Sequence, residues 1–302
     1  MAADSLSTLG IRPTKYQTNL TCVERGARAR ARARAVLRAL GHAHTPSLVA
    51  KRKNAMPEAG STEPSTSTFI DDVSISAESD YTAIATKQTT GGHVWDAARH
   101  LLRFLEGRPE LLASTRSVLE LGAGTGWLGM TLARNVPTLQ RVCLTEMLDG
   151  GAFAWLQHNV AQNAALPLGA VETLPCDWLW FGESAPDECS GDAAPVAHAR
   201  AALLSSRFDM VLGSDLVYDE VGMRALVQVF GALAESRDVK IFYAHTRYRF
   251  EMLDRDMLEA LDARGLECVQ VDPAVEERPD SPPPMSELFP EMFVVVYEIR
   301  LQ

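Results

Sequence analysis

The sequence VLELGAGTG at residues 118–126 decides the fold of this chain. Apolar residues that suit a strand lead into three glycines, and a helix-forming stretch follows from Trp127. Glycine lacks the Cβ atom that would keep a ligand away from the backbone, so a ligand can approach this turn closely. In an open α/β sheet such a ligand lies at the carboxyl end of the first strand. The stretch therefore predicts an α/β fold with a binding crevice after that strand.

Glu120 precedes the first glycine by two positions and indicates the charge of the ligand. We expect its carboxylate at the mouth of the crevice, where it would repel the pyrophosphate of a dinucleotide and attract an ammonium and a sulfonium group. The dinucleotide fingerprint GxGxxG also fails, because Trp127 stands where it requires glycine. A nicotinamide or flavin site, and a tight turn without a ligand, are the alternatives.

Strands and helices alternate from Ser117 onward, which predicts a parallel sheet with helices on both faces. Strands are expected at 117–121, 141–145, 170–174, 208–213, 239–244, 267–271 and 292–299, after two short strands at Phe69–Ile75 and Tyr81–Thr86. Helices are expected from Val94 and at 127–135, 150–163, 220–235 and 250–264. Only the loop Asp272–Pro290 joins the last two strands, which favours an antiparallel pair. We expect a doubly wound, seven-stranded, mostly parallel sheet with an antiparallel last strand.

Charge divides the chain into two parts. Residues 1–53 carry a net charge of +9, and residues 54–302 carry −19. The Arg–Ala alternation at 26–35 predicts a solvated arm, helical or disordered, with a cleavable transit peptide or a nucleic-acid arm as alternatives. Residues 54–68 have the composition of a linker. We therefore expect a basic arm and linker at 1–68 and a folded domain at 69–302.

Composition also excludes several classes of protein. The acidic charge of the folded part disfavours nucleic acid as a partner and suits a basic protein segment. The sequence contains no run of 18 apolar residues and no secretory signal, so we expect no membrane partner. Five scattered cysteines without a CxxC pair indicate a reducing compartment and no metal site. We expect a monomer in the cytoplasm, or in an organelle if the arm is a transit peptide.

Two acidic positions follow the second and third strands. Glu146 lies 24 residues after Gly122, where a strand-end carboxylate accepts hydrogen bonds from ribose hydroxyls. Asp177 and Trp178 could bind an adenine, with polar groups at its amino edge and the indole against its ring. The alternatives are an ordinary strand-end acid and an ordinary loop with a partly buried Trp. The insertion Gly182–Arg200 that follows is expected to be flexible.

Asp215 and Tyr218 come at the end of the fourth strand, facing the same crevice. A carboxylate and a phenol at this place could bind an incoming amine and orient its lone pair. The alternative is that Asp215 caps the helix that follows. His93 and His245 are expected near the site as hydrogen-bonded residues, whereas His42 and His44 lack further metal ligands.

These elements together resemble methyltransferase family 16, the protein-lysine methyltransferases of the seven-strand class with a Rossmann-like fold. The resemblance covers roughly residues 69–302 and rests on GGHVW at 91–95, ExGxGxG from Glu120, Asp-Trp at 177–178 and Asp-x-x-Tyr from Asp215. The Val-Trp and Asp-x-x-Tyr elements are specific, and the glycine turn alone marks only the wider class. The stretches Tyr243–Arg247 and Leu288–Pro290 resemble the branch that methylates elongation factor 2.

The resemblance implies transfer of a methyl group from the cofactor S-adenosylmethionine to a lysine of a protein partner with a basic segment, such as a translation factor. It implies cofactor binding by Trp95, Glu120, Gly122, Gly124, Gly126, Glu146, Asp177 and Trp178. It implies that Asp215 and Tyr218 lie at the target-amine channel as catalytic residues. A small molecule or another protein side chain as acceptor, and a non-catalytic binding module, are the alternatives. The sequence departs from the family at Glu146, often Asp there, at the bulky Trp127 and in the insertion 182–200.

Overall fold

The computed structural model of this protein describes residues 68–76, 91–181, 194–235, 238–272 and 293–302. The predicted arm and linker (apart from Thr68), the predicted strand Tyr81–Thr86 and the stretch Leu288–Pro290 lie outside these residues. The division of the chain at residue 68 therefore stays a prediction.

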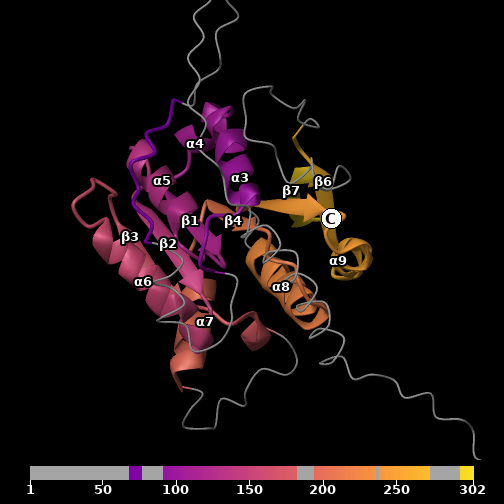
Figure 1. Ribbon diagram of the computed structural model, residues 1–302. Coiled ribbons are helices and arrows are strands. Elements are labelled where there is room, and N and C mark those ends of the chain that lie inside the picture. Colours follow the sequence, from indigo (N-terminus) through magenta and orange to yellow (C-terminus); the bar gives the residue numbers. More distant parts are fainter. Residues whose placement is uncertain (1–67, 77–90, 182–193, 236–237, 273–292) are drawn as a thin grey trace, which may run out of the picture. The chain divides into compact units, whose positions relative to one another are not determined.

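A seven-stranded sheet in the order β3-β2-β1-β4-β5-β7-β6 forms the centre of the described structure (Figure 1). Its strands are β1 Ser117–Leu121, β2 Arg141–Glu146, β3 Val171–Pro175, β4 Met210–Ser214, β5 Lys240–Arg247, β6 Leu266–Gln270 and β7 Phe293–Leu301. Strands β1 to β5 pair in parallel, and β7 pairs antiparallel with both β5 and β6. The predicted antiparallel last strand is confirmed, and it lies between β5 and β6.

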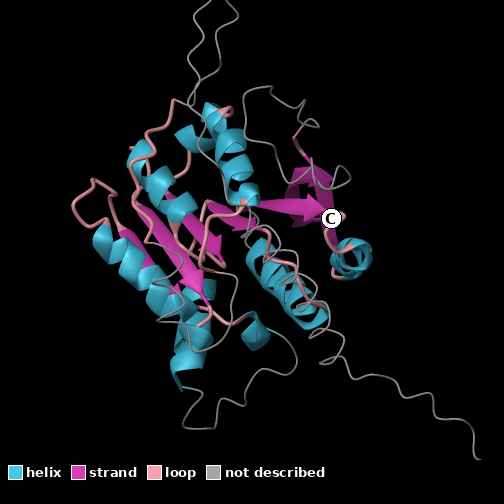
Figure 2. Ribbon diagram, viewed as in Figure 1, coloured by secondary structure: helices cyan, strands magenta, loops and turns pink. Residues whose placement is uncertain are grey.

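Helices cover both faces of this sheet (Figures 1 and 2). One face carries α3 Asp96–Glu106, α5 Trp127–Asn135 and α6 Ala152–Gln162, and the other carries α7 Ala194–Ser205, α8 Glu220–Ala234 and α9 Glu251–Ala263. Short helices are α4 Pro109–Ala113, η1 Asp149–Gly151 and η2 Trp178–Phe181. In β1, Val118 packs into one core and Leu119 and Leu121 into the other, as alternating strand side chains must. Burial on both sides explains the continuous apolar run in the sequence.

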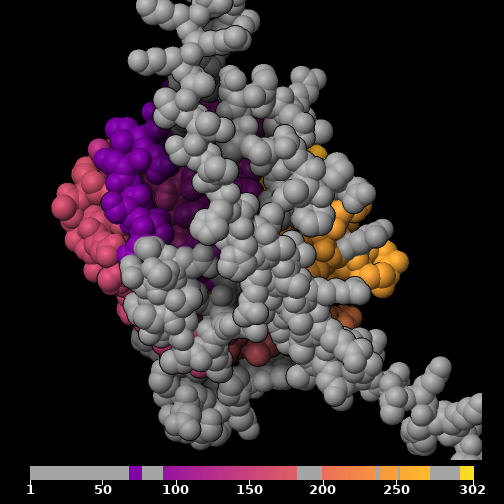
Figure 3. Space-filling view, in the orientation of Figure 1, coloured from indigo at the N-terminus to yellow at the C-terminus, as the bar shows by residue number. Residues whose placement is uncertain are grey.

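The predicted strand Phe69–Ile75 is wrong. This segment is a loop (Figure 2) on the surface beside α6 (Figure 3). The amide of Ile70 donates to Asn135 Oδ1 at 2.6 Å, and the amide of Ser74 donates to Asn163 Oδ1 at 2.8 Å. Side chains at the ends of α5 and α6 thus take the place of a neighbouring strand, which the alternation of the segment could not reveal.

The predicted flexibility of the insertion Gly182–Arg200 is contradicted at its end, where a helix forms. Residues 182–193 lie outside the described structure, but α7 begins at Ala194 and continues past Arg200. Alanine and leucine in this stretch favour helix. Ala199 and Leu203 are buried against the core, so tertiary packing fixes the helix. None of the described helices combines the length and apolar character needed to cross a bilayer.

Candidate active site

The order of strands reverses between β1 and β4, which lie side by side with Leu121 opposite Gly213. In open α/β sheets, ligands bind at such a switch point, at the carboxyl ends of the strands. The loops after β1 and β4 therefore face the same edge. We call Glu120, Gly122–Gly126, Glu146 and Trp178 the glycine-turn site. We call Trp95, Asp215, Thr246 and Arg249 the Asp215 clamp.

The glycine turn needs its glycines for two reasons. Gly122, Gly124 and Gly126 have φ values of +56°, +54° and +79°, where other L-residues are strained. A Cβ atom on Gly122 would also stand 2.6 Å from Leu216 Cδ2. On Gly124 it would stand 3.4 Å from the Cα and carbonyl O atoms of Gly91. The turn is thus packed between the loop after β4 and the Gly91 loop.

Glu120 does not lie at the mouth of a crevice, and this corrects the sequence-based expectation. Its side chain is buried under α5, where Oε2 accepts a hydrogen bond of 2.9 Å from the amide of Gly129 in the first helical turn. Burial raises the pKa of Glu120 to about 8; the Gly129 hydrogen bond opposes the rise, and the negative charge of Glu146 adds to it. The carboxylate sits where the positive end of the helix dipole favours an anion.

This position of Glu120 gives a second reason against a dinucleotide. A dinucleotide places its pyrophosphate at the amino end of the first helix, on the free backbone amides. In this protein the carboxylate of Glu120 already accepts from an amide of that turn. The predicted exclusion therefore agrees with the structure, although the geometry behind it differs.

Glu146 ends β2 and is held by backbone amides on both oxygens. Oε2 accepts from Gly124 at 2.9 Å, and Oε1 accepts from Met147 at 2.8 Å. Burial raises the pKa of Glu146, and these two hydrogen bonds oppose the rise. Each carboxylate oxygen has a second lone pair, so the group can still accept two hydroxyl hydrogens. This arrangement suits a ribose.

Trp178, expected from the sequence to bind an adenine, packs against the same turn. Its Cζ2 atom lies 3.2 Å from the place of a Cβ on Gly122, so the indole borders the turn directly. Asp177 Oδ1 accepts from the amide of Leu179 at 3.0 Å, which leaves Oδ2 for another partner. Flat apolar surface beside a carboxylate is what an adenine requires.

Asp215 directly follows β4 and is the centre of the Asp215 clamp. Its side chain is 3% exposed. Oδ1 accepts from the amide of Thr246 at 2.8 Å, and Oδ2 accepts from Thr246 Oγ1 at 2.8 Å. Arg249 Nη2 forms an ion pair with Oδ2 at 3.0 Å. Asp215 therefore binds a cation of its own chain, which the sequence analysis did not anticipate.

The alternative role for Asp215, capping the helix that follows, is wrong. Asp219 caps α8, with Oδ1 accepting from the amide of Gly222 at 2.8 Å. Tyr218 lies between Asp215 and Asp219 in the sequence, and its side chain is 48% exposed. Trp95 comes from the start of α3, and the guanidinium carbon of Arg249 lies 5.0 Å from the centre of its indole ring. The structure thus brings Trp95 to Asp215 through Arg249.

A buried relay supports the loop after β4. The Leu216 amide donates to Tyr243 Oη at 3.2 Å, Tyr243 Oη lies 3.1 Å from His245 Nδ1, and His245 Nε2 lies 2.8 Å from Asp254 Oδ1. Because a carboxylate only accepts, His245 Nε2 carries a proton and donates it to Asp254, and Nδ1 can then accept from Tyr243. Asp254 Oδ2 also accepts from the amide of Tyr248 at 2.7 Å. His245 was expected near the site, but Tyr243 and Asp254 were missed.

A signal for this relay exists in the sequence. Tyr243 and His245 are two positions apart, so a strand places both on one face. Thr246 and Arg249 gave no comparable signal. The strand was predicted to end at residue 244, and β5 continues to Arg247. The three extra residues bring Thr246 to Asp215.

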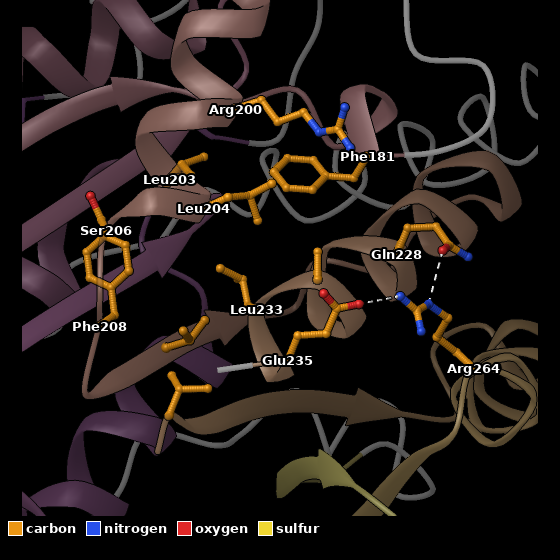
Figure 4. Close-up of a pocket in the computed structure, with 13 residues that line it drawn as sticks. Phe181, Arg200, Leu203, Leu204, Ser206, Phe208, Gln228, Leu233, Glu235 and Arg264 are labelled. Atoms are coloured by element: carbon orange, nitrogen blue, oxygen red, sulfur yellow. Dashed lines mark hydrogen bonds and ion pairs between the residues drawn. The ribbon is translucent and has the colours of Figure 1, made fainter. Parts of the chain in front are cut away.

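A cavity of about 380 Å³ lies elsewhere (Figure 4). Its lining includes Phe208, Val211 and Val239, near the amino ends of β4 and β5, and Arg200 and Arg264. The loops of the switch point follow the opposite, carboxyl ends of these strands. None of the predicted site residues lines this cavity, so it is separate from the site.

The charge of the glycine-turn site complements that of the implied cofactor. In the described part of the chain, neither Glu120 nor Glu146 forms an ion pair. Burial raises the pKa of Glu120, and repulsion from Glu146 adds to the rise. A ligand with a permanent positive charge would relieve this repulsion. The free lone pairs of Glu146 and the indole of Trp178 suit a nucleoside. These residues fit S-adenosylmethionine, which carries both features.

Comparison with known proteins defines the class. A family described as lysine methyltransferase matches residues 82–262, more than half of the chain. The chain therefore belongs to this lysine methyltransferase family, as the sequence resemblance predicted, and its members use S-adenosylmethionine. The match includes both the glycine turn and the Asp215 clamp.

Particular relatives are protein N-lysine methyltransferases. The protein N-lysine methyltransferase METTL21A of Xenopus tropicalis is 29% identical over 168 residues, which cover 56% of this chain and 65% of that protein. METTL21A of Danio rerio is 31% identical over 159 residues, which cover 51% and 61%. The chain thus matches somewhat less than two thirds of the length of these relatives. An O-methyltransferase family protein from Burkholderia thailandensis shares 13% identity, with a TM-score of 0.42 over 68% of this chain and 56% of that chain.

Proposed function

We propose that this protein transfers the methyl group of S-adenosylmethionine to a lysine side chain of another protein. The observation that carries the proposal is the meeting of two sites at one switch point within a lysine methyltransferase family. One is acidic and has no counter-cation among the described residues, and the other holds a cation between a carboxylate and an indole. The first suits a cationic donor, and the second suits a lysine side chain.

The glycine-turn site would hold the cofactor. Glu146 would accept the ribose hydroxyls, and Asp177 and Trp178 would bind the adenine. The positive sulfonium would lower the pKa of Glu120 from about 8, so that Glu120 would become negatively charged beneath α5. Gly122, Gly124 and Gly126 would let the donor approach the backbone, and Trp95 would border its methionine part. When bound, the cofactor supplies an electrophilic methyl group on a sulfonium, and a neutral thioether leaves.

The Asp215 clamp would receive the lysine. Displacement at a methyl group requires the attacking nitrogen to lie in line with the leaving sulfur, so the main task of the protein is positioning. Asp215 and Tyr218 would align the amine. The amine must first lose a proton to solvent, because a lysine ammonium with a pKa of about 10.4 has no lone pair for attack. Asp215 would dock the amine and not remove that proton.

The experiment is methyl labelling. Purified protein, radiolabelled S-adenosylmethionine and a cell lysate are incubated, and purified elongation factor 2 is a second acceptor, since the sequence resembles that branch. We expect labelled protein whose hydrolysate contains methyl-lysine by mass spectrometry. Label in small molecules, or in another side chain, would contradict the lysine proposal but keep methyl transfer.

Absence of any label together with micromolar cofactor binding would favour a non-catalytic binding module. We propose a translation factor as the acceptor, because the stretches Tyr243–Arg247 and Leu288–Pro290 resemble the branch that methylates elongation factor 2. We also propose a cytoplasmic location. Fractionation of cells that express the full chain tests this against an organelle.

A further inference from the structure

Two strained residues mark the Asp215 clamp. Among the described residues other than glycine, only Asp215 and Tyr248 have positive φ values, of 52° and 63°. Such a conformation costs on the order of 1–3 kcal/mol and persists only where the surroundings enforce it. The Asp215 amide donates to the Ala244 carbonyl at 2.9 Å, and the Tyr248 amide donates to Asp254 at 2.7 Å. Both turns are thus held in place, and together they bring Asp215 and Arg249 into contact.

Arg249 is bound on several sides. Nη2 lies 3.0 Å from Asp215 Oδ2 and donates to Thr246 Oγ1 at 3.3 Å, while the guanidinium carbon stands 5.0 Å from the centre of the Trp95 ring. The Arg249 side chain is 24% exposed and Asp215 only 3%. Solvent screens a pair this deeply buried only weakly. Removal of either charge would therefore strongly change the electrostatic potential at a neighbouring amine.

The pair answers a difficulty in the proposed reaction. A carboxylate alone beside the target lysine would stabilise its ammonium form, which cannot attack. A guanidinium within 3.0 Å of that carboxylate cancels its charge as seen by the amine. Arginine is suited to this because it stays charged at every relevant pH, whereas a lysine could lose its proton.

We infer that Arg249, paired with Asp215, is the residue that keeps the target lysine in its neutral, reactive form. The inference rests on the proposed function, because it assumes that an amine enters beside Asp215. Arg249 is a positioning residue in this scheme: it acts on the lysine through Asp215. Asp215 can then accept a hydrogen bond from a neutral amine without holding an ammonium ion.

Other titratable groups around the pair do not replace it. Tyr243 lies nearby on β5, and burial raises its pKa well above the ordinary value, with the charge of Asp215 adding to the rise, so it stays neutral. Asp254 on α9 is bound by His245 and by the Tyr248 amide. Arg247 on β5 lies 5.1 Å from the centre of the Tyr248 ring. His93, before α3, lies against Trp95, with ring centroids 4.3 Å apart, and Tyr218 follows β4.

The first test uses n-butylammonium, which has the charged end of a lysine side chain, and needs no methyl transfer. Its binding to the full chain at neutral pH is measured by NMR titration for wild type, Arg249→Gln and the double variant Asp215→Asn/Arg249→Gln. Arg249→Gln should bind the cation about tenfold more tightly, because an unpaired carboxylate shifts such an equilibrium by about one pKa unit or more. The double variant should lose this gain.

The matched control is Arg255→Gln. Arg255 lies on α9, is 63% exposed and pairs with Asp256 and Glu259, so its loss changes the net charge equally but leaves the clamp intact. It should bind n-butylammonium as wild type does. Equal binding by wild type and Arg249→Gln would overturn the inference, whether or not the protein methylates anything.

The second test is the pH profile of methyl transfer to the acceptor found by labelling. In Arg249→Gln the lysine ammonium is stabilised, so the acid limb should move to higher pH by about one unit. Arg249→Lys should keep the wild-type limb at neutral pH. Cofactor affinity, measured by calorimetry, and the midpoint of thermal unfolding should stay as in wild type, which shows that the shift in the pH profile does not come from damage to the fold. A lower rate with an unshifted limb would mean that Arg249 is merely structural and would overturn the inference.

Discussion

The glycine-turn site and the Asp215 clamp hold their carboxylates in different ways. In β1 and at the end of β2, Glu120 and Glu146 accept hydrogen bonds from backbone amides, which carry no net charge. After β4, Asp215 also accepts from a backbone amide, but a hydroxyl and a guanidinium bind it as well, and the guanidinium cancels its charge. In the first arrangement burial raises the pKa of both carboxyl groups, so a permanently cationic ligand would favour their ionised forms. In the Asp215 clamp, the paired carboxylate can bind an amine without stabilising its ammonium form. Each of the following predictions tests one side of this comparison.

The largest effect is expected on the glycine-turn side. Gly124→Arg places a side chain at a φ of +54°, 3.4 Å from Gly91. A left-handed conformation costs an L-residue about 1–2 kcal/mol, and the long side chain would also obstruct the turn. We expect S-adenosylmethionine affinity to fall by at least about 100-fold, measured by calorimetry.

Its matched control is Gly265→Arg. Gly265 has a similar φ of +74°, but a Cβ there would meet nothing within 4 Å. This variant should bear the same backbone strain and keep cofactor affinity. Unchanged affinity in Gly124→Arg would rule out the glycine turn as the binding site.

On the other side, Asp215→Ala should separate binding from transfer. We expect cofactor affinity to stay within about twofold of wild type, while the methylation rate falls about 100-fold because the amine is misaligned. The control is Asp219→Ala, which removes the cap of α8. It should cost about 1 kcal/mol of stability and little activity. Normal methylation by Asp215→Ala would show that this carboxylate does not receive the acceptor.

The relay beneath the clamp should contribute chiefly to stability. Tyr243→Phe leaves the amide of Leu216 without its buried acceptor and His245 without its donor. Loss of such a partner costs about 1–3 kcal/mol. Urea unfolding measures this loss. A stability change near zero would mean that the loop after β4 is held by packing alone.

The most gradual effect, spread over several pH units, concerns the pH dependence of stability on the glycine-turn side. Glu120 has a pKa of about 8 in the folded protein, above the value of 4.5 that applies when unfolded. Its contribution to stability is therefore full below pH 4.5 and is lost as pH rises through 8. Relative to Glu120→Gln, the wild-type free energy of unfolding should fall by up to about 1.4 kcal/mol per pH unit in this window. Parallel curves for the two proteins would contradict the buried position of Glu120.

The two sides also differ in how far the sequence revealed them. Residues 117–121 and 127–135 form the strand and helix predicted for them, because apolar runs and glycines determine local structure directly. Glu120 was expected to face the ligand, since its position in the strand does not show that α5 supplies an amide at 2.9 Å. The local sequence pattern therefore predicted the strand correctly but did not reveal where the Glu120 side chain points.

The Asp215 clamp was largely hidden from sequence reasoning. Asp215 and Tyr218 stood out because they end a strand, but Arg249 reaches Asp215 only through the strained turn at Tyr248. A residue with positive φ other than glycine cannot be recognised from composition. Thr246 contacts Asp215 because β5 runs three residues beyond its predicted end. Pairings across 31 and more residues depend on the register of neighbouring strands.

The position of β7 has a consequence for synthesis on the ribosome. This strand occupies the place between β5 and β6, with Ile241 opposite Ile299. In the nascent polypeptide, β6 emerges before its neighbour exists, and the edge of β5 stays open until residues 293–301 have been translated. At about 5–20 residues per second this interval lasts seconds, long enough for chaperones to engage the exposed edge.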